Sequence, residues 1–147
     1  MKQIRRILHA TDLSPASRRA FDTALVMAKS LNAKLTIAYV LAPVVTVPDQ
    51  YIDAATLDRL DQQARQWSTQ HLDRLASRAK KAGVKATVVL RDGDPADQIV
   101  RACRAAKSDL IIVGTHGRRG LPKFFLGSVA ERVVSTATCP VVTVRGK

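Results

Sequence analysis

The sequence has few aromatic residues, no long apolar run and few acidic residues, and each shortage excludes a class of protein. One Trp, two Tyr and three Phe are spread over 147 residues, without the clusters beside arginines that stack nucleic-acid bases. No apolar run approaches the ~18 residues needed to cross a bilayer, and the N-terminus has no signal-peptide core. We therefore expect a cytoplasmic protein with no membrane partner and no specific nucleic-acid site.

Cysteine and histidine are too sparse and too widely spaced to indicate a metal centre. Cys103 and Cys139 are not arranged as CxxC, so they form no metal or redox motif. His9, His71 and His116 are far apart, and no two have metal-ligand spacing. We interpret both cysteines as packing residues and name no protein ligand for a metal.

The scarcity of acidic residues leaves a formal net charge of +12, which is unevenly distributed. Residues 1–73 hold nine Lys/Arg and seven Asp, whereas residues 74–147 hold fifteen Lys/Arg and five Asp/Glu. A polyanion partner is one interpretation. The alternative is an ordinary basic surface exposed to solvent.

Short apolar segments alternate with helical patterns along the whole chain. Strands are expected at 4–10, 35–41, 84–90, 110–113 and 141–144, and helices at 14–31, 53–82, 128–136 and from Asp94. Ser14-Pro15 and Asp94-Pro95 are helix-start signals, and Asp53 is a third candidate cap. In the second helix, helical spacing suggests a core-facing row formed by Leu57, Leu60, Ala64, Trp67, His71, Leu75 and Ala79. The alternation predicts a single-domain α/β fold, a parallel sheet with helices on both faces.

Ligands of such sheets bind beyond the carboxyl ends of the strands, where the strand order reverses. Thr11 and Asp12 follow the first expected strand, Val40 ends the second, and Gly114 follows the fourth. The Asp12 carboxylate could accept hydrogen bonds from a sugar hydroxyl or a base amine, or lie near a metal. Alternatively, Asp12 caps the turn that follows it.

The most informative segment is 109–131, which reads DLIIVGTHGRRGLPKFFLGSVAE. Gly114 and Gly117 allow a ligand to approach the backbone closely. Gly127, Ser128 and Val129 lie where a helix begins, and the amides of a helix start form an anion site. A glycine-rich turn that binds nothing is the alternative.

Arg118, Arg119 and Lys123 could add cations to this anion site. The glycines are not followed by Gly-Lys-Ser/Thr, so the segment is no Walker loop. The first strand is followed by TDLSP, without the glycines of a dinucleotide fingerprint. Ser128 has no nucleophile-elbow motif, which argues against a hydrolase triad.

The glycine spacing resembles the ATP-binding signature of the universal stress protein family. The pattern G-x-x-G-x9-G-S is formed by Gly114, Gly117, Gly127 and Ser128. The similarity covers nearly the whole chain, including ILHATDLSPASRRAFDTAL near the start, GDPADQIV before the third helix and CPVVTV at the end. Tyr39 departs from it, because many relatives have His before the valine.

The resemblance implies a five-stranded parallel sheet of order 3-2-1-4-5, the adenine nucleotide alpha hydrolase-like fold. It implies that Asp12 and the backbone near Val40 hold adenosine, that Gly114 and Gly117 border the ribose and phosphates, and that the helix start at Gly127 to Val129 holds the phosphates. Mg or Mn often accompanies the nucleotide. Members are commonly homodimers through the last strand, here 141–144.

The leading hypothesis is therefore an ATP-binding regulatory protein of the stress response. No general base or water-orienting residue for fast phosphoryl transfer is evident. A slow Mg-dependent ATPase or phosphotransferase using the same pocket is the enzymatic alternative. A protein- or polyanion-interaction module that binds no nucleotide is the second alternative.

Overall fold

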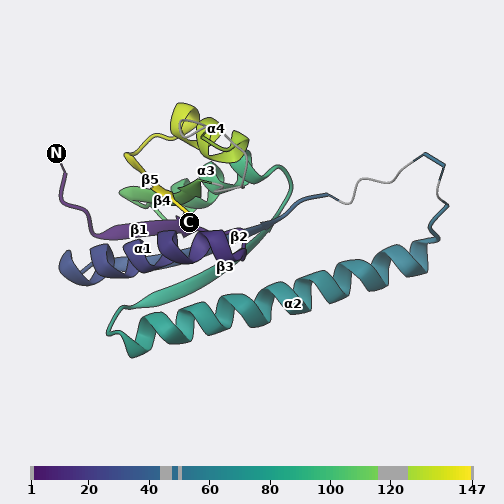
Figure 1. The fold of residues 1–147 in the computed structure, drawn as a ribbon, viewed down its shortest axis with the longest axis horizontal. Helices are drawn as coiled ribbons and strands as arrows, with labels where there is room; N and C mark the ends of the chain where they lie inside the picture. The colour runs from purple at the N-terminus through teal and green to yellow at the C-terminus, as the bar shows by residue number, and fades with distance from the viewer. Residues whose placement is uncertain (1, 44–47, 50, 116–125, 147) are drawn as a thin grey trace.

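The computed structural model describes residues 2–43, 48–49, 51–115 and 126–146 (Figure 1). Its strands form one parallel sheet of order β3-β2-β1-β4-β5, which confirms the expected topology. The strands are β1 (Arg6–Ala10), β2 (Lys34–Leu41), β3 (Ala86–Asp92), β4 (Leu110–Thr115) and β5 (Val141–Arg145). The helices are η1 (Pro15–Ser17, a short 3-10 turn), α1 (Arg18–Ser30), α2 (Ala54–Lys81), α3 (Pro95–Ala105) and α4 (Ser128–Thr136).

The helices cover both faces of the sheet, as expected for a parallel sheet (Figure 1). Alternate strand residues point to opposite faces, so neighbouring residues of one strand enter different cores. One core joins Ile7 and Ile112 to buried residues of α1 and α2. The other joins Leu8 and Ile111 to buried residues of α3 and α4. No helix formed by the described residues is long and apolar enough to span a membrane.

Side-chain caps define the starts of two helices, α2 and α3. The side chains of Asp53 and Asp94 accept hydrogen bonds from the backbone N–H of Thr56 at 2.7 Å and Asp97 at 3.0 Å, which confirms both caps. Ser14 precedes η1 but makes no side-chain cap. Val84 was expected in a strand, but its N–H bonds to the carbonyl of Ala79 in the turn that ends α2. β3 therefore begins two residues later, at Ala86.

The expected core-facing row of α2 is wrong in its N-terminal half. Leu60 is 45% exposed and Trp67 is 48% exposed. The buried row is instead Ser68, Leu72, Ala76 and Ala79. The sheet covers only the C-terminal half of α2, and the N-terminal half extends beyond it (Figure 1). Arg65 marks the limit, because it forms ion pairs with Asp61 on the same helix and Asp92 at the end of β3.

His9 of β1 is buried in the core of the fold. The residue is 0% exposed, and its ring centroid lies 5.8 Å from that of Phe21. Its Nδ1 lies 3.1 Å from the carbonyl oxygen of Ile112, so Nδ1 carries the proton and donates it. Burial lowers the pKa of His9 from 6.5 to about 4, against the opposing effects of the Ile112 carbonyl and the Asp12 charge.

Candidate functional site

A cavity lies at the carboxyl ends of the strands, where the strand order reverses between β1 and β4. Its volume is about 280 Å³, at the low end of the roughly 300–1,000 Å³ typical of ligand sites. We call it the switch-point cavity. It is lined by Ala10, Thr11, Asp12, Ala16, Ser17, Ala38, Tyr39, Val40, Pro95, Ile99, Val113, Gly114, Thr115, Val129 and Ala130.

Most of the residues expected to bind a ligand come together at this cavity. The lining includes five expected residues: Thr11 and Asp12 directly after β1, Val40 in β2, Gly114 in β4 and Val129 in α4. These segments are distant in sequence but converge, because parallel strands bring their carboxyl ends to one edge.

Other expected residues lie beside the cavity or outside the described part of the chain. Gly127 and Ser128 directly precede Val129 at the start of α4, but they are not among the lining residues. Gly117 and Arg118 fall within 116–125, outside the described residues. Gly114 has ordinary space around it, since an added Cβ would lie 3.5 Å from the Cβ of Ala20.

The turn after β1 is held by a chain of hydroxyl hydrogen bonds. Ser17 Oγ donates to the carbonyl of Ser14 at 2.8 Å. The Thr11–Ser17 contact of 3.0 Å must therefore have Thr11 Oγ1 as its donor. Thr11 Oγ1 also accepts the backbone N–H of Leu13 at 3.0 Å. These bonds hold Thr11 and Ser17, two residues that line the cavity, in place in the turn after β1.

Leu13 has an unusual backbone conformation in this turn. Its φ is 60°, in the left-handed region that a branched side chain seldom adopts. Such strain persists only where surrounding contacts impose it, and it is frequent at ligand sites. The Thr11 hydroxyl supplies one such contact through the Leu13 N–H. Asp12, the exposed residue directly before Leu13, is one of the residues that line the cavity.

Of the two roles that the sequence left open for Asp12, the structure shows the turn cap. Its Oδ1 accepts hydrogen bonds from the Ser14 N–H at 2.9 Å and the Ser14 hydroxyl at 2.6 Å, so it does cap the turn. It also lines the cavity, where it is the only carboxylate among the described lining residues. The Ser14 hydroxyl therefore donates to Asp12 within the turn and does not cap the following helix.

The start of α4, next to the cavity, carries backbone amides that have no partner within the helix. Gly127 is the N-cap, and the first helical bond runs from the Glu131 N–H to the Gly127 carbonyl at 2.9 Å. The N–H groups of Ser128, Val129 and Ala130 consequently lack partners within the helix. These amides and the helix dipole favour an anion. Gly127 has a φ of −52°, so no left-handed backbone is required there.

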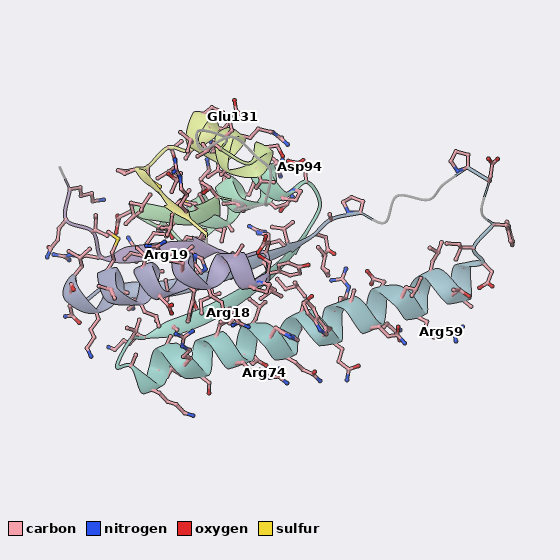
Figure 2. All side chains as sticks on the ribbon, in the orientation of Figure 1. Arg18, Arg19, Arg59, Arg74, Asp94 and Glu131 are labelled. Carbon is pink, nitrogen blue, oxygen red and sulfur yellow. The ribbon has the colours of Figure 1, made fainter. Side chains whose placement is uncertain are left out.

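An ion pair joins the start of α3 to the middle of α4. Arg132 of α4 contacts Asp94, the N-cap of α3, at 2.9 Å, and Figure 2 shows Asp94 close to α4. The hydrogen bond from Arg132, and then that from the Asp97 backbone N–H, lowers the pKa of Asp94. The pair is exposed to solvent, so it links the two helices that supply Pro95 and Val129 to the cavity but contributes little stability.

Several lining residues were not anticipated from the sequence. Ala16, Ala38 and Ala130 make room because their side chains are small, and Thr115 extends β4 beyond its expected end. Small residues give no local signal of a site. Pro95 could have been found, because the Asp94-Pro95 signal follows a strand and therefore starts its helix at the ligand edge.

The chemistry of the cavity is that of a binding site for an apolar ring with polar substituents. Its walls are mostly apolar, with hydroxyls from Thr11, Ser17 and Thr115 and a carboxylate from Asp12. Tyr39, which stands where many universal stress proteins have His, lies in the wall beside Val40. Within the described part of the chain, no group of three or more His, Cys, Asp or Glu could hold a metal ion.

The chain is an open α/β sheet of the class whose ligands bind at the carboxyl ends of the strands, at the switch point. The universal stress protein family model matches residues 3–145. A universal stress protein of Methanocaldococcus jannaschii is 33% identical over 143 residues, covering 96% of this chain and 82% of that relative. The Bacillus subtilis universal stress protein YxiE is 31% identical, covering 95% of this chain and 98% of the relative. The chain belongs to the universal stress protein family.

A solved structure supports the same assignment. The crystal structure of a universal stress protein in complex with cAMP has a TM-score of 0.72 and 28% sequence identity to this chain. The alignment covers 98% of both chains.

Proposed function

We propose that this chain binds an adenine nucleotide, with ATP as the expected ligand, in the switch-point cavity. The observation that carries the proposal is the cavity itself, an apolar chamber with Asp12 at its rim and the amides of α4 beside it. A volume of about 280 Å³ suits a nucleoside better than a whole nucleotide. The phosphates would then extend toward Ser128.

The assignment of the ligand parts follows from the polarity of the walls. Val40 and Ile99 offer apolar contact to adenine, and Asp12 accepts hydrogen bonds from ribose hydroxyls. The universal stress protein bound to cAMP supports an adenine nucleotide as the ligand class. Gly117 and Arg118 complete the proposed phosphate site. A Mg or Mn ion would be carried by the phosphates.

We propose regulation rather than rapid catalysis as the role of binding. Among the described lining residues, Asp12 is the only carboxylate that could serve as a base, and its Oδ1 already accepts two hydrogen bonds. Hydrolysis is therefore slow at most. We place this regulation in the stress response, in the cytoplasm, where nucleotide occupancy would change how the protein assembles.

The proposed assembly is a homodimer through β5. This strand is an edge of the sheet, and three of its five residues are valines. Exposed apolar edges invite pairing. The Pro140 carbonyl accepts the Ile111 N–H, and the Gly146 N–H donates to the Thr115 carbonyl. With the register of β4 and β5, these bonds mean that the backbone N–H and C=O groups of Val142 and Val144 point toward β4. The Thr143 N–H therefore points outward, away from the sheet. Thr143→Pro should give a monomer in light scattering with unchanged circular dichroism, whereas a persistent dimer would place the interface elsewhere.

Calorimetry on protein stripped of nucleotide tests the binding proposal directly. ATP should release or absorb heat with saturable stoichiometry, and adenosine should bind more weakly because it lacks the phosphates. The proposal fails if ATP gives no signal and freshly purified protein carries no adenine nucleotide.

Charge variants separate the two halves of the proposed ligand. Ser128→Asp places a carboxylate at the exposed first residue of α4, where it favours the helix but repels phosphate. ATP affinity should fall at least about tenfold, which corresponds to ~1.4 kcal/mol, with little change for adenosine. Ser135→Asp, at the other end of α4, adds the same charge as a control. Equal effects of the two variants would remove the phosphate site from α4.

Asp12→Asn tests the adenosine half. The amide keeps an oxygen that can accept the Ser14 hydrogen bonds, but it removes the negative charge. We expect weaker binding of both ATP and adenosine, with the fold preserved. Asp58→Asn, on an exposed residue of α2, is the matched control. Unchanged adenosine binding in Asp12→Asn would exclude the proposed ribose contact.

A further inference from the structure

Cys103 and Cys139, separated by 36 residues in sequence, meet in the fold. Their sulfur atoms are 3.4 Å apart, and both are free thiols. We propose that they form a reversible intramolecular disulfide, a site of redox modification. This pairing is not predictable from the sequence, because two cysteines without CxxC spacing are interpreted as packing residues.

The local backbone favours closure of the bond. Cys103 lies on α3, whereas Cys139 lies in the short irregular segment between α4 and Pro140. A disulfide bond is about 2.05 Å long, so the sulfurs need to approach by about 1.4 Å. One partner stays fixed on a helix while the other can adjust in a turn. The remaining contact of the Cys103 thiol, 3.8 Å to the Ser108 carbonyl, is weak enough to be given up.

The two thiols differ in access. Cys103 is 3% exposed, whereas Cys139 is half-buried and therefore the point of entry for an oxidant. Burial, and then the contact with Cys139, raises the pKa of Cys103 to about 12. A thiol of this kind is a poor first nucleophile. Cys103 consequently acts as the second thiol, which reacts only after Cys139 has been modified.

The oxidant is a small disulfide such as oxidised glutathione. The Cys139 thiolate attacks one sulfur, the small S–S bond breaks, and one small thiolate leaves and takes up the proton from Cys139. Cys103 then loses its proton and attacks the Cys139 sulfur, which expels the second small thiol. Two protein thiols are oxidised by two electrons, and the small disulfide is reduced to two thiols.

The bond would tie the C-terminal end of α3 to the segment leading into β5. Its consequences therefore fall on the sheet edge rather than on the switch-point cavity, which is lined by residues from the opposite end of α3. In a reducing compartment the pair stays as thiols and closes only under oxidation. The proposal holds whether or not the chain binds a nucleotide.

Mass spectrometry of the full chain tests the pairing. The reduced protein is equilibrated with mixtures of oxidised and reduced glutathione, quenched with an alkylating reagent and weighed intact. We expect a species lighter by two hydrogen atoms, without glutathione or alkyl groups. Trypsin should then release the peptides ACR and VVSTATCPVVTVR joined to each other, and reductant should separate them.

Two variants test the order of events, with circular dichroism to verify that both fold. Cys103→Ser should retain one glutathione on Cys139, because no second thiol expels it. Cys139→Ser should leave Cys103 unmodified under the same conditions. The proposal is overturned if the wild type gives two alkylated thiols at every ratio, a disulfide between two chains, or glutathione on both cysteines. Glutathione on Cys103 in the Cys139→Ser variant would overturn the order.

Discussion

Mild acid should destabilise this protein through one residue, the buried His9. The neutral ring donates from Nδ1 to the Ile112 carbonyl, and its Nε2 has no hydrogen-bond partner among the described residues. Protonation would place a charge and an unsatisfied N–H in the core between β1 and Phe21. The folded state therefore resists protonation, and the pKa of His9 falls from 6.5 to about 4.

The size of the effect follows from this difference in pKa. Below pH 6.5 the unfolded chain binds a proton at His9 that the folded chain refuses, so the free energy of unfolding decreases as pH falls. The loss grows by ~1.36 kcal/mol per pH unit until the pH reaches about 4, the folded pKa. Between pH 7.5 and pH 5.0 it amounts to ~2 kcal/mol.

Urea denaturation at pH 7.5 and pH 5.0 measures the loss, with His9→Gln as the control that cannot titrate. The decisive quantity is the pH-dependence of each protein rather than its absolute stability. Asp53, Asp94 and Asp109 have pKa values lowered from 3.8, so their contributions are lost only at more acidic pH. An equal decrease for wild type and His9→Gln would refute the role of His9.

Three further comparisons test the packing by urea denaturation. Phe21→Ala removes a ring that is 1% exposed and should cost about 3–5 kcal/mol, whereas a cost below about 1 kcal/mol would contradict its place in the core. Gly83→Ala should cost ~1 kcal/mol because Gly83 has a φ of 84°. Gly114→Ala should cost less because the backbone of Gly114 is not left-handed. A larger cost for Gly114→Ala than for Gly83→Ala would contradict this explanation. Leu72→Ala should cost about 2–5 kcal/mol. Leu60→Ala, at an exposed position, should cost less than about 1 kcal/mol. Equal costs would indicate that Leu60 packs in the core, as the helical spacing predicted.

The alternation of strands and helices could be predicted because nearly every element carries its own signal. Helix α4 begins and ends as expected, at Ser128 and Thr136. The Asp53 and Asp94 caps were also readable, since a cap depends on residues three positions apart. The order of the strands in the sheet, in contrast, has no local signal in the sequence. It came from the family resemblance, because alternation alone does not say which strands are neighbours.

Features that depend on contacts between distant segments could not be predicted. Helix α2 carries two rows at helical spacing, and only the reach of the sheet decides that Leu72 rather than Leu60 is buried. The switch-point cavity is likewise shaped by small residues, such as Ala16 and Ala38, from separate segments. The apposition of Cys103 and Cys139 belongs to the same class of feature.

The turn after β1 limits the part that Asp12 could play in the proposed nucleotide site. A carboxylate can act as a general base only by taking up a proton, and a protonated Asp12 would weaken the hydrogen bonds that its Oδ1 accepts from the Ser14 N–H and hydroxyl. Those bonds maintain the turn in which Leu13 is held at a φ of 60°. Catalysis by Asp12 would therefore loosen the wall that positions the ligand. The proposed binding role makes no such demand, because a carboxylate that accepts a hydrogen bond does not change its protonation.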